Sequence, residues 1–495
     1  MKLKPSITVI LAFIAVQTAV YSQNTVFPRL VPDPKALEFY RLGESGGYSW
    51  IQLAEISLWA SGDNSRANLE KIRAAADTIK NAADLPDTNE GKAEYILTFM
   101  YKNLLKSYSL YQTRIDVMLS TGRYNCVSSA VLYMILCESI GVHTNGVMTK
   151  DHAFITIPID GKDHIDVETT NAYGFDPGNR KEFHDQFGKL TGFSYVPAKN
   201  YRDRETISQI ELVSLILNNR IADHERVNQF AESVPVAIDR AALLEGSVLK
   251  VDSTTETHRA IFTDPRIDLL DRLFNFGAML LRAGKEEDCL RWAATASPIY
   301  PDEKRWQEFI MAAVNNNQTK LLKSSKYADA RKFLEGQKQV LSQANYDKLE
   351  SILVDSELSG KAYQIRTAAD GDSVINAIDL ARNGGKIPEK RAVELITFAV
   401  QKTASSVSAP PGGTWRAAIQ YIEASLSRFG ANRELEQALN VYRSNLATDY
   451  HNRFATEWNK KNYDEAERIL NEGLGEFPKD RQLLSDKQII EKQGR

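Results

Sequence analysis

The chain has 495 residues, of which 43% are hydrophobic and 25% are charged, and its 61 Lys and Arg against 64 Asp and Glu leave a formal net charge of −3. This composition is that of a globular protein of more than one domain, and no stretch gathers the basic residues that a nucleic-acid groove requires. The 3 cysteines are too few for a disulfide framework and lack paired CxxC spacing, which leaves single-thiol chemistry as the role open to a cysteine.

Residues 1–22 have the features of a signal peptide. Lys2 and Lys4 form a short positive region, Ile7 to Val16 is an apolar run, and Val20-Tyr21-Ser22 precedes a cleavage point. The apolar run has about ten residues, short of the ~20 that span a bilayer, and no later segment reaches that length. We therefore expect a cleaved signal, with a retained anchor as the alternative, and a mature chain without a transmembrane helix that is extracytoplasmic, either periplasmic or secreted.

The mature chain is predicted to begin with a helical segment over residues 23–90. Apolar side chains recur there at helical spacing, as at Ile51, Ile56 and Trp59. From 91 to 205 the pattern becomes that of a compact α+β unit. This unit has a helix from Val127 to Ser139 and then short β-rich runs at Ala153–Ile157 and Ile165–Thr169, around an Asp160-Gly161 turn.

Residues 206–404 and 415–495 are predicted to be helical, and a linker or long loop over 405–414 contains Pro410-Pro411-Gly412-Gly413. Small and apolar residues in both helical regions follow the 34-residue tetratricopeptide (TPR) pattern, in which small side chains let antiparallel helices approach closely and each pair stacks on the next. The matches are Gly277, Leu280, Gly284, Cys289, Ala293, Ala296 and Pro301, then Ala466, Leu470, Gly473 and Pro478, with Tyr327 and Ala330 as a degenerate third unit. We expect a TPR-like solenoid that binds a protein partner, with an unrelated helical domain as the alternative.

Cys126 is the candidate nucleophile. Asn125 is a good helix cap, so Cys126 is expected in the first turn of the helix, where the positive end of the helix dipole favours the thiolate that attacks carbonyl carbons. The alternative is a small buried residue that begins a core helix. Cys137 lies in an apolar run and Cys289 at a small-residue packing position, so both are predicted to be core thiols.

A base and an acid follow Cys126 in the sequence. His152 begins a predicted strand, and Asp166 and Glu168 lie on its predicted hairpin partner. A cysteine nucleophile needs a base within hydrogen-bond reach, and that base needs a carboxylate to orient it and to stabilise the imidazolium. The hairpin can supply both groups.

The register of this hairpin decides which acid faces His152. A two-residue loop at Asp160-Gly161 would pair His152 with Thr169 and turn both acids to the opposite face. A three-residue loop or one bulge would place Glu168 opposite or diagonal to His152, with Asp166 on the same face ~6.6 Å farther along. Glu168 is then the better partner, and Asp166 stays open because strand ends are often irregular.

A metal site is a rival interpretation of the same residues. His152, His164, Asp166 and Glu168 could in principle bind zinc. Two-residue steps along a strand would spread these donors over more than ~13 Å, so the sequence predicts neither a metal site nor a cofactor.

The three blocks of residues resemble the transglutaminase-like superfamily, whose papain-like core uses Cys, His and Asp. Asn125-Cys126, His152-Ala153-Phe154 and Val167-Glu168-Thr169-Thr170 match those blocks, and the similarity covers roughly residues 90–200. The resemblance implies a papain-like α+β domain, here preceded by helices and followed by the all-α TPR-like solenoid. The family usually carries Asp at the position of Glu168, and Asp166 lies close by, so both acids remain candidates for the triad.

The resemblance implies thiol chemistry. His152 would take the proton of Cys126, the thiolate would attack an acyl carbon, and the thioester would pass to water or to an amine; by similarity, the Cys126 backbone amide helps bind the oxyanion. The family includes cysteine peptidases, amide-exchanging transferases, deglycosylating amidases and inactive members. We therefore expect an exported bacterial enzyme that cleaves or transfers peptide or peptidoglycan amide bonds. The alternative is an inactive exported scaffold that binds a protein partner through its TPR-like helices.

Overall fold

The computed structural model describes residues 25–159, 162–179, 183, 189, 204–247, 261–409 and 414–492. The predicted signal peptide, the Asp160-Gly161 turn and the segment Pro410-Pro411-Gly412-Gly413 lie outside these residues. The described chain is mostly helical, with a small β region in its first half. It divides into two compact units at Trp306/Gln307.

The first unit begins with helices that pack mainly against other helices of the same unit. They are α2 (Pro34–Glu44), α3 (Trp50–Ala60), α4 (Arg66–Lys80), α5 (Asn89–Asn103) and α6 (Ile115–Thr121). Ser49 caps α3 through a capping box with Gln52, and α3 is buried along most of its length because it packs against two later helices, α7 (Cys126–Ser139) and α9 (Gln209–Arg226).

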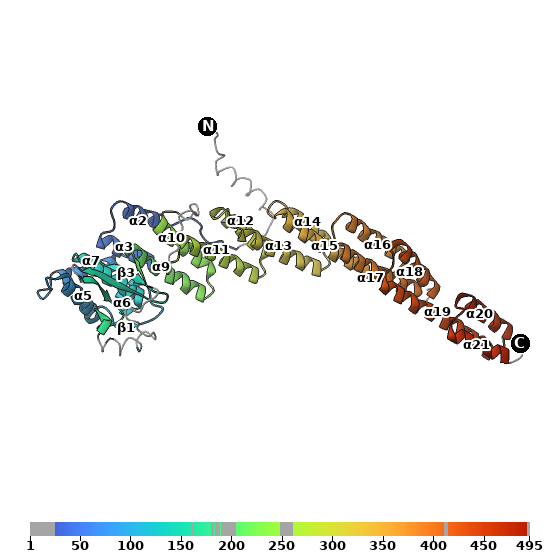
Figure 1. The fold of residues 1–495 in the computed structure, drawn as a ribbon. Helices are drawn as coiled ribbons and strands as arrows, with labels where there is room; N and C mark the ends of the chain where they lie inside the picture. Colours follow the sequence, from blue (N-terminus) through green and yellow to red (C-terminus); the bar gives the residue numbers. More distant parts are fainter. Residues whose placement is uncertain are drawn as a thin grey trace, which may run out of the picture. The chain divides into compact units, whose positions relative to one another are not determined.

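The β region consists of one antiparallel sheet and one short parallel pair. The sheet contains β3 (Asn145–Met148), β4 (Ala153–Ile159), β5 (Lys162–Val167) and β6 (Glu205–Ile207) in the order β5-β4-β3-β6. Helix α7 packs against β4, and Figure 1 shows the sheet among the helices of this unit. The parallel pair is β1 (Ser107–Tyr108) with β2 (Arg123–Tyr124), directly before α7.

One irregularity in the β4–β5 hairpin sets which side chains share a face. Ile159 pairs with Lys162, which is the register of a two-residue turn, whereas Ile157 pairs with Ile165. Across this step β5 has one residue more than β4, so the register shifts by one. After this shift, the even-numbered residues of both strands lie on the same face. Asp166 and Glu168, the two candidate acids, therefore lie on the same side of the hairpin as His152.

Helices continue after the sheet within the first unit. Helices α9, α10 (Phe230–Glu245), α11 (Pro265–Arg282) and α12 (Glu286–Ala296) each pack against the preceding one. The start of the described chain is attached to them, since the Phe27 ring contacts Phe276 and Trp292 edge-on and Arg29 forms a 2.7 Å ion pair with Asp239. The N-terminal segment and these helices therefore belong to one packed body.

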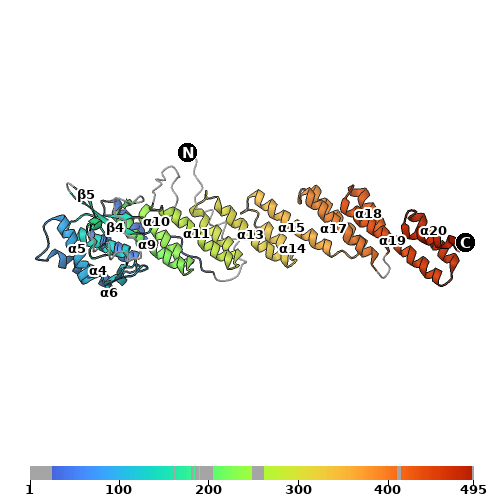
Figure 2. The same ribbon diagram turned by 60° about the horizontal axis from the view of Figure 1, so that its bottom comes forward.

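The second unit is entirely helical in its described residues (Figure 2). Its helices are α13 (Arg305–Lys323, which begins at the end of the first unit), α14 (Tyr327–Gly336), α15 (Gln343–Tyr363), α16 (Ala368–Asn383), α17 (Glu389–Ser408), α18 (Trp415–Phe429), α19 (Arg433–Asn459), α20 (Tyr463–Glu476) and α21 (Arg481–Lys492). Helix α17 extends through residues 405–408 of the predicted linker because Thr403 and Ala404 are buried against neighbouring helices. None of the described helices combines the length and the apolarity needed to span a membrane.

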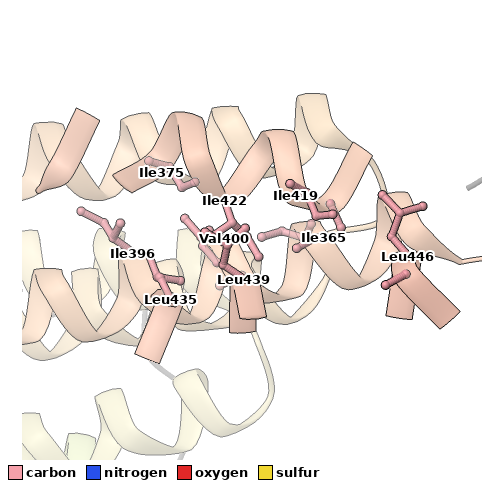
Figure 3. Close-up of a cluster of buried hydrophobic side chains, with 14 of the residues drawn as sticks. Ile365, Ile375, Ile396, Val400, Ile419, Ile422, Leu435, Leu439 and Leu446 are labelled. Atoms are coloured by element: carbon pink, nitrogen blue, oxygen red, sulfur yellow. The ribbon is translucent and has the colours of Figure 1, made fainter. Parts of the chain in front are cut away.

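The second unit has a continuous apolar core. Figure 3 shows side chains from α16, α17, α18 and α19 meeting between the helices, among them Ile375, Val400, Ile422 and Leu439. Small residues permit this packing. A Cβ at Gly473 of α20 would lie 3.0 Å from the Cβ of Tyr450 on α19, so only glycine fits there without displacement.

We expect Ile422→Ala to lower the free energy of unfolding of the second unit by about 2–5 kcal/mol, because Ile422 is fully buried and truncation leaves a cavity. Urea unfolding followed by circular dichroism measures this change. Leu380→Ala is the matched control, since Leu380 is 76% exposed and its truncation should change stability by less than about 0.5 kcal/mol. Equal effects of the two substitutions would contradict the described core.

Candidate active site

Cys126 is the first residue of α7, and a capping box holds it there. Asn125 Oδ1 accepts a hydrogen bond from the Ser128 amide at 3.0 Å, and Ser128 Oγ accepts one from the Asn125 amide at 2.9 Å. The Asn125 side-chain amide also donates to the Leu110 carbonyl at 3.2 Å, which ties the helix start to the preceding loop. Because the cap fixes where the helix begins, the Cys126 thiol lies at the positive end of the helix dipole.

The three cysteines differ in accessibility. Cys126 is partly exposed, whereas Cys137 and Cys289 are fully buried. Burial raises the pKa of the Cys137 thiol and raises the pKa of Cys289 to about 12, with a further contribution from Glu286. Cys126 is therefore the thiol that a substrate or reagent can reach in the folded protein.

His152 lies directly before β4, between Cys126 and Glu168. Its Nε2 is 2.5 Å from Glu168 Oε2, and the side chains of His152 and Glu168 are 9% and 2% exposed. The Cys126 thiol lies close enough to the ring to contribute to the raised pKa of His152. The ring of Phe154 stacks on the imidazole, with centroids 6.3 Å apart, and holds the plane of the ring.

The charge state of His152 follows from these neighbours. Burial alone would lower the pKa of the imidazole, but the Glu168 carboxylate and the nearby Cys126 thiol outweigh it, and the pKa of His152 is raised well above its ordinary value. The raised pKa makes His152 a better acceptor of the Cys126 proton. An imidazolium between a carboxylate and a thiol stabilises the thiolate.

The turn after β5 orients the Glu168 carboxylate. Its second oxygen, Oε1, accepts hydrogen bonds from the backbone amide and the hydroxyl of Thr170, at 3.1 and 2.7 Å. The Glu168 amide donates to the Gly174 carbonyl at 2.8 Å, and a Cβ at Gly174 would lie 1.9 Å from the Glu168 carbonyl oxygen. The Tyr101 hydroxyl donates to the Thr169 carbonyl at 3.0 Å. The turn therefore needs glycine at position 174 and holds the carboxylate toward His152.

Asp166, the other candidate acid, has a different partner. Both of its oxygens accept hydrogen bonds from the Arg204 guanidinium, each at 2.6 Å. Arg204 also lies over the Phe154 ring, 5.3 Å from its centroid, and His164 Nε2 is 3.8 Å from Asp166. The structure thus brings Glu168 together with Cys126 and His152, and it places Asp166 in an ion pair beside them.

A cavity of about 390 Å³ opens beside Cys126 and His152. Its opposite wall comes from α9, through Leu215, Asn219 and Ala222, and at its edge the Arg226 guanidinium lies 3.6 Å from the centroid of the Tyr111 ring. The amino-acid sequence gives no sign of this wall. No spacing pattern could have revealed it, because nearly a hundred residues separate α9 from Cys126.

Within the described residues, no cluster of three or more His, Cys, Asp or Glu side chains is arranged to hold a metal ion. No known family model matches this chain, and a search of curated proteins finds no match. The chemistry of the site must therefore be argued from its own geometry.

We expect iodoacetamide to alkylate Cys126 alone in the folded protein at neutral pH, because Cys137 and Cys289 are buried thiols with raised pKa values. Peptide mass spectrometry identifies the modified residue. Alkylation in denaturant, where all three thiols should react, is the control. Modification of Cys137 or Cys289 in the folded state at the rate of Cys126 would contradict the described burial.

We expect Glu168→Gln to move the pH midpoint of Cys126 alkylation upward by at least about one unit. Without the carboxylate, burial lowers the pKa of His152, the imidazolium is lost at lower pH, and the thiolate forms only at higher pH. Rates of iodoacetamide alkylation from pH 5 to 10 give the midpoint.

Asp166→Asn is the matched control for this prediction. Asp166 lies on the same face but pairs with Arg204, so the midpoint should stay at the wild-type value. A shift as large as that of Glu168→Gln would show that Asp166, and not Glu168, sets the charge of His152.

Proposed function

We propose that this protein is an exported thiol enzyme that cleaves or transfers amide bonds through Cys126, His152 and Glu168. The observation that carries the proposal is the buried imidazole of His152, which is bonded to Glu168 and lines the same open cavity as Cys126. A nucleophile, a base and an orienting acid in this order are the parts that acyl transfer requires.

The arrangement supports a two-stage reaction. The Cys126 proton passes to His152, and the thiolate attacks the carbonyl carbon of an amide. When the tetrahedral intermediate collapses, the C–N bond breaks and His152 gives its proton to the leaving amine, which leaves a thioester on Cys126. Water or a second amine then attacks the thioester while His152 accepts its proton, and the Cys126 thiol is restored. Hydrolysis and transfer differ only in this second nucleophile.

The start of α7 contributes to stabilising the intermediate. The backbone N–H of Cys126 is one of the first amides of the helix, which have no acceptor within the helix itself. An oxyanion formed on the carbon attacked by Cys126 lies next to this N–H and to the positive end of the helix dipole. The capping box keeps the amide in place during the reaction.

Helix α7 packs against β4, His152 directly precedes β4 and Glu168 directly follows β5, which supports the papain-like core that the resemblance to the transglutaminase-like superfamily implies. Glu168 stands where that family usually carries Asp, and the longer side chain still reaches the imidazole. Together with the export signal expected at residues 1–22, this supports peptide or peptidoglycan amides in an extracytoplasmic compartment as substrates.

The helices after the sheet support a second role in protein binding. Three residues of the TPR-like match are buried in the pair α11 and α12, namely Gly277, Cys289 and Ala293. In the second unit, α20 buries two further residues of the match, Ala466 and Gly473. Large apolar side chains remain exposed in the second unit, including Leu380 at 76%, Tyr363 at 66% and Val441 at 58%. These features favour TPR-like helices that bind a protein, and an inactive scaffold built on them is the second candidate function.

Labelling Cys126 decides between the enzyme and the scaffold. For the enzyme we expect the midpoint of iodoacetamide alkylation to lie at least about one pH unit below the ~8.5 of free cysteine, and His152→Ala to abolish this activation. His164→Ala is the matched control, because His164 is a more exposed histidine of the same hairpin and should change nothing. An ordinary midpoint that His152→Ala does not alter would support the scaffold.

A further inference from the structure

Three tyrosines pack together next to the start of α7, and the hydroxyl of one of them has no hydrogen-bond partner among the described residues. The ring of Tyr124 contacts the rings of Tyr101 and Tyr108 edge-on, with each pair of centroids 6.0 Å apart. The Tyr101 and Tyr124 hydroxyls bond to each other and to the carbonyls of Thr169 and Thr170. The Tyr108 hydroxyl is buried and has no hydrogen-bond partner in the described part of the chain. Because a buried donor without an acceptor is unfavourable, this hydroxyl calls for a functional explanation.

The backbone places Tyr108 close to the nucleophile. In the β1–β2 pair, Tyr108 lies opposite Tyr124, and Tyr124 is two residues before Cys126 in the sequence. The Ser109 amide donates a hydrogen bond to the Tyr124 carbonyl at 2.7 Å. Burial, followed by the charges of Cys126 and Glu168, raises the pKa of Tyr108. The hydroxyl therefore keeps its proton and is available as a donor to an anion that forms at Cys126.

Two side-chain amides that precede α7 are already engaged. The Gln112 amide donates to the carbonyls of Arg114 and Arg123, at 2.8 and 3.0 Å, and the Asn125 amide donates to Leu110. Neither amide is available for a substrate without breaking a contact that holds the loop before Cys126. Among the described residues, the Tyr108 hydroxyl is a buried donor near Cys126 with no hydrogen-bond partner.

We propose that the Tyr108 hydroxyl is the side-chain donor of the oxyanion hole and, together with the Cys126 backbone N–H, hydrogen-bonds the oxyanion that forms when Cys126 attacks an acyl carbon. The inference rests on the proposed thiol chemistry and adds a catalytic residue to it. A preorganised donor that acquires its acceptor only in the transition state lowers the barrier without stabilising the bound substrate.

Two reactions of the same thiol separate this role from a structural one. With p-nitrophenyl acetate, the Cys126 sulfur bonds to the acetyl carbon, p-nitrophenolate leaves with the electron pair of the broken C–O bond, and the thiol proton goes to His152. This reaction passes through an oxyanion. Alkylation by iodoacetamide displaces iodide from a saturated carbon and forms no oxyanion, although it needs the same thiolate.

We expect Tyr108→Phe to slow acetylation at least about tenfold while alkylation at pH 6.5 changes by less than about twofold, so that the ratio of the two rate constants falls at least about tenfold. The release of p-nitrophenolate and the mass of the intact protein give the two rates. The ratio does not depend on the fraction of active protein, so partial misfolding of the variant leaves the test valid. Tyr124→Phe is the matched control and should keep the wild-type ratio, because its hydroxyl already bonds to Tyr101 and Thr170.

If Tyr108→Phe keeps the ratio of acetylation to alkylation within about twofold of the wild-type value, the inference is wrong. An equal loss in both reactions gives the same ratio, and would mean that the hydroxyl supports the thiolate or the fold and not the oxyanion. The proposed function fails separately. If the wild type is acetylated no faster than His152→Ala, the thiol is not activated, and the role of Tyr108 falls with it. If the wild type exceeds His152→Ala but Tyr108→Phe keeps the ratio, the role of Tyr108 alone is wrong.

Discussion

The contact between the His152 ring and the Glu168 carboxylate, 2.5 Å between Nε2 and Oε2, is the interaction on which the rest of the site depends. An imidazole buried at this depth would by itself lose its proton, and the carboxylate reverses that tendency. The raised pKa of the ring is what the proposed thiol chemistry requires of a base beside Cys126. A buried charge pair of this kind persists only if both partners are held in place, so much of the surrounding structure serves to hold it.

Two sets of contacts hold the pair. Thr170 bonds the second oxygen of Glu168, and Gly174 lets the turn after β5 close over the backbone of Glu168. On the same face of the hairpin, Arg204 binds both oxygens of Asp166 and covers Phe154, which in turn stacks on His152. Arg204 thereby neutralises a second negative charge that would otherwise compete with Glu168 for the imidazolium.

The helical region contributes to the site as well as to the proposed protein binding. Helix α9, the first helix after the sheet, forms a wall of the cavity at Cys126, and α10 to α12 pack on in succession within the same unit. The sheet, α9 and the helices up to α12 therefore belong to one compact unit, which ends at Trp306. A change of composition reports a change of secondary structure, whereas a unit is defined by which surfaces bury one another.

The sequence by itself determined the local features. These are the cap at Asn125 that starts α7 at Cys126, the strand that begins after His152, and the burial of Cys137 and Cys289. They can be predicted because capping and apolar periodicity act over a few residues. The sequence left Glu168 and Asp166 as alternatives. Only the tertiary structure decided between them, through one extra residue in β5 that set the shared face and through Arg204, an ion-pair partner far along the chain. The cavity wall from α9 and the unpartnered hydroxyl of Tyr108 likewise depend on contacts between distant segments, which no local pattern encodes.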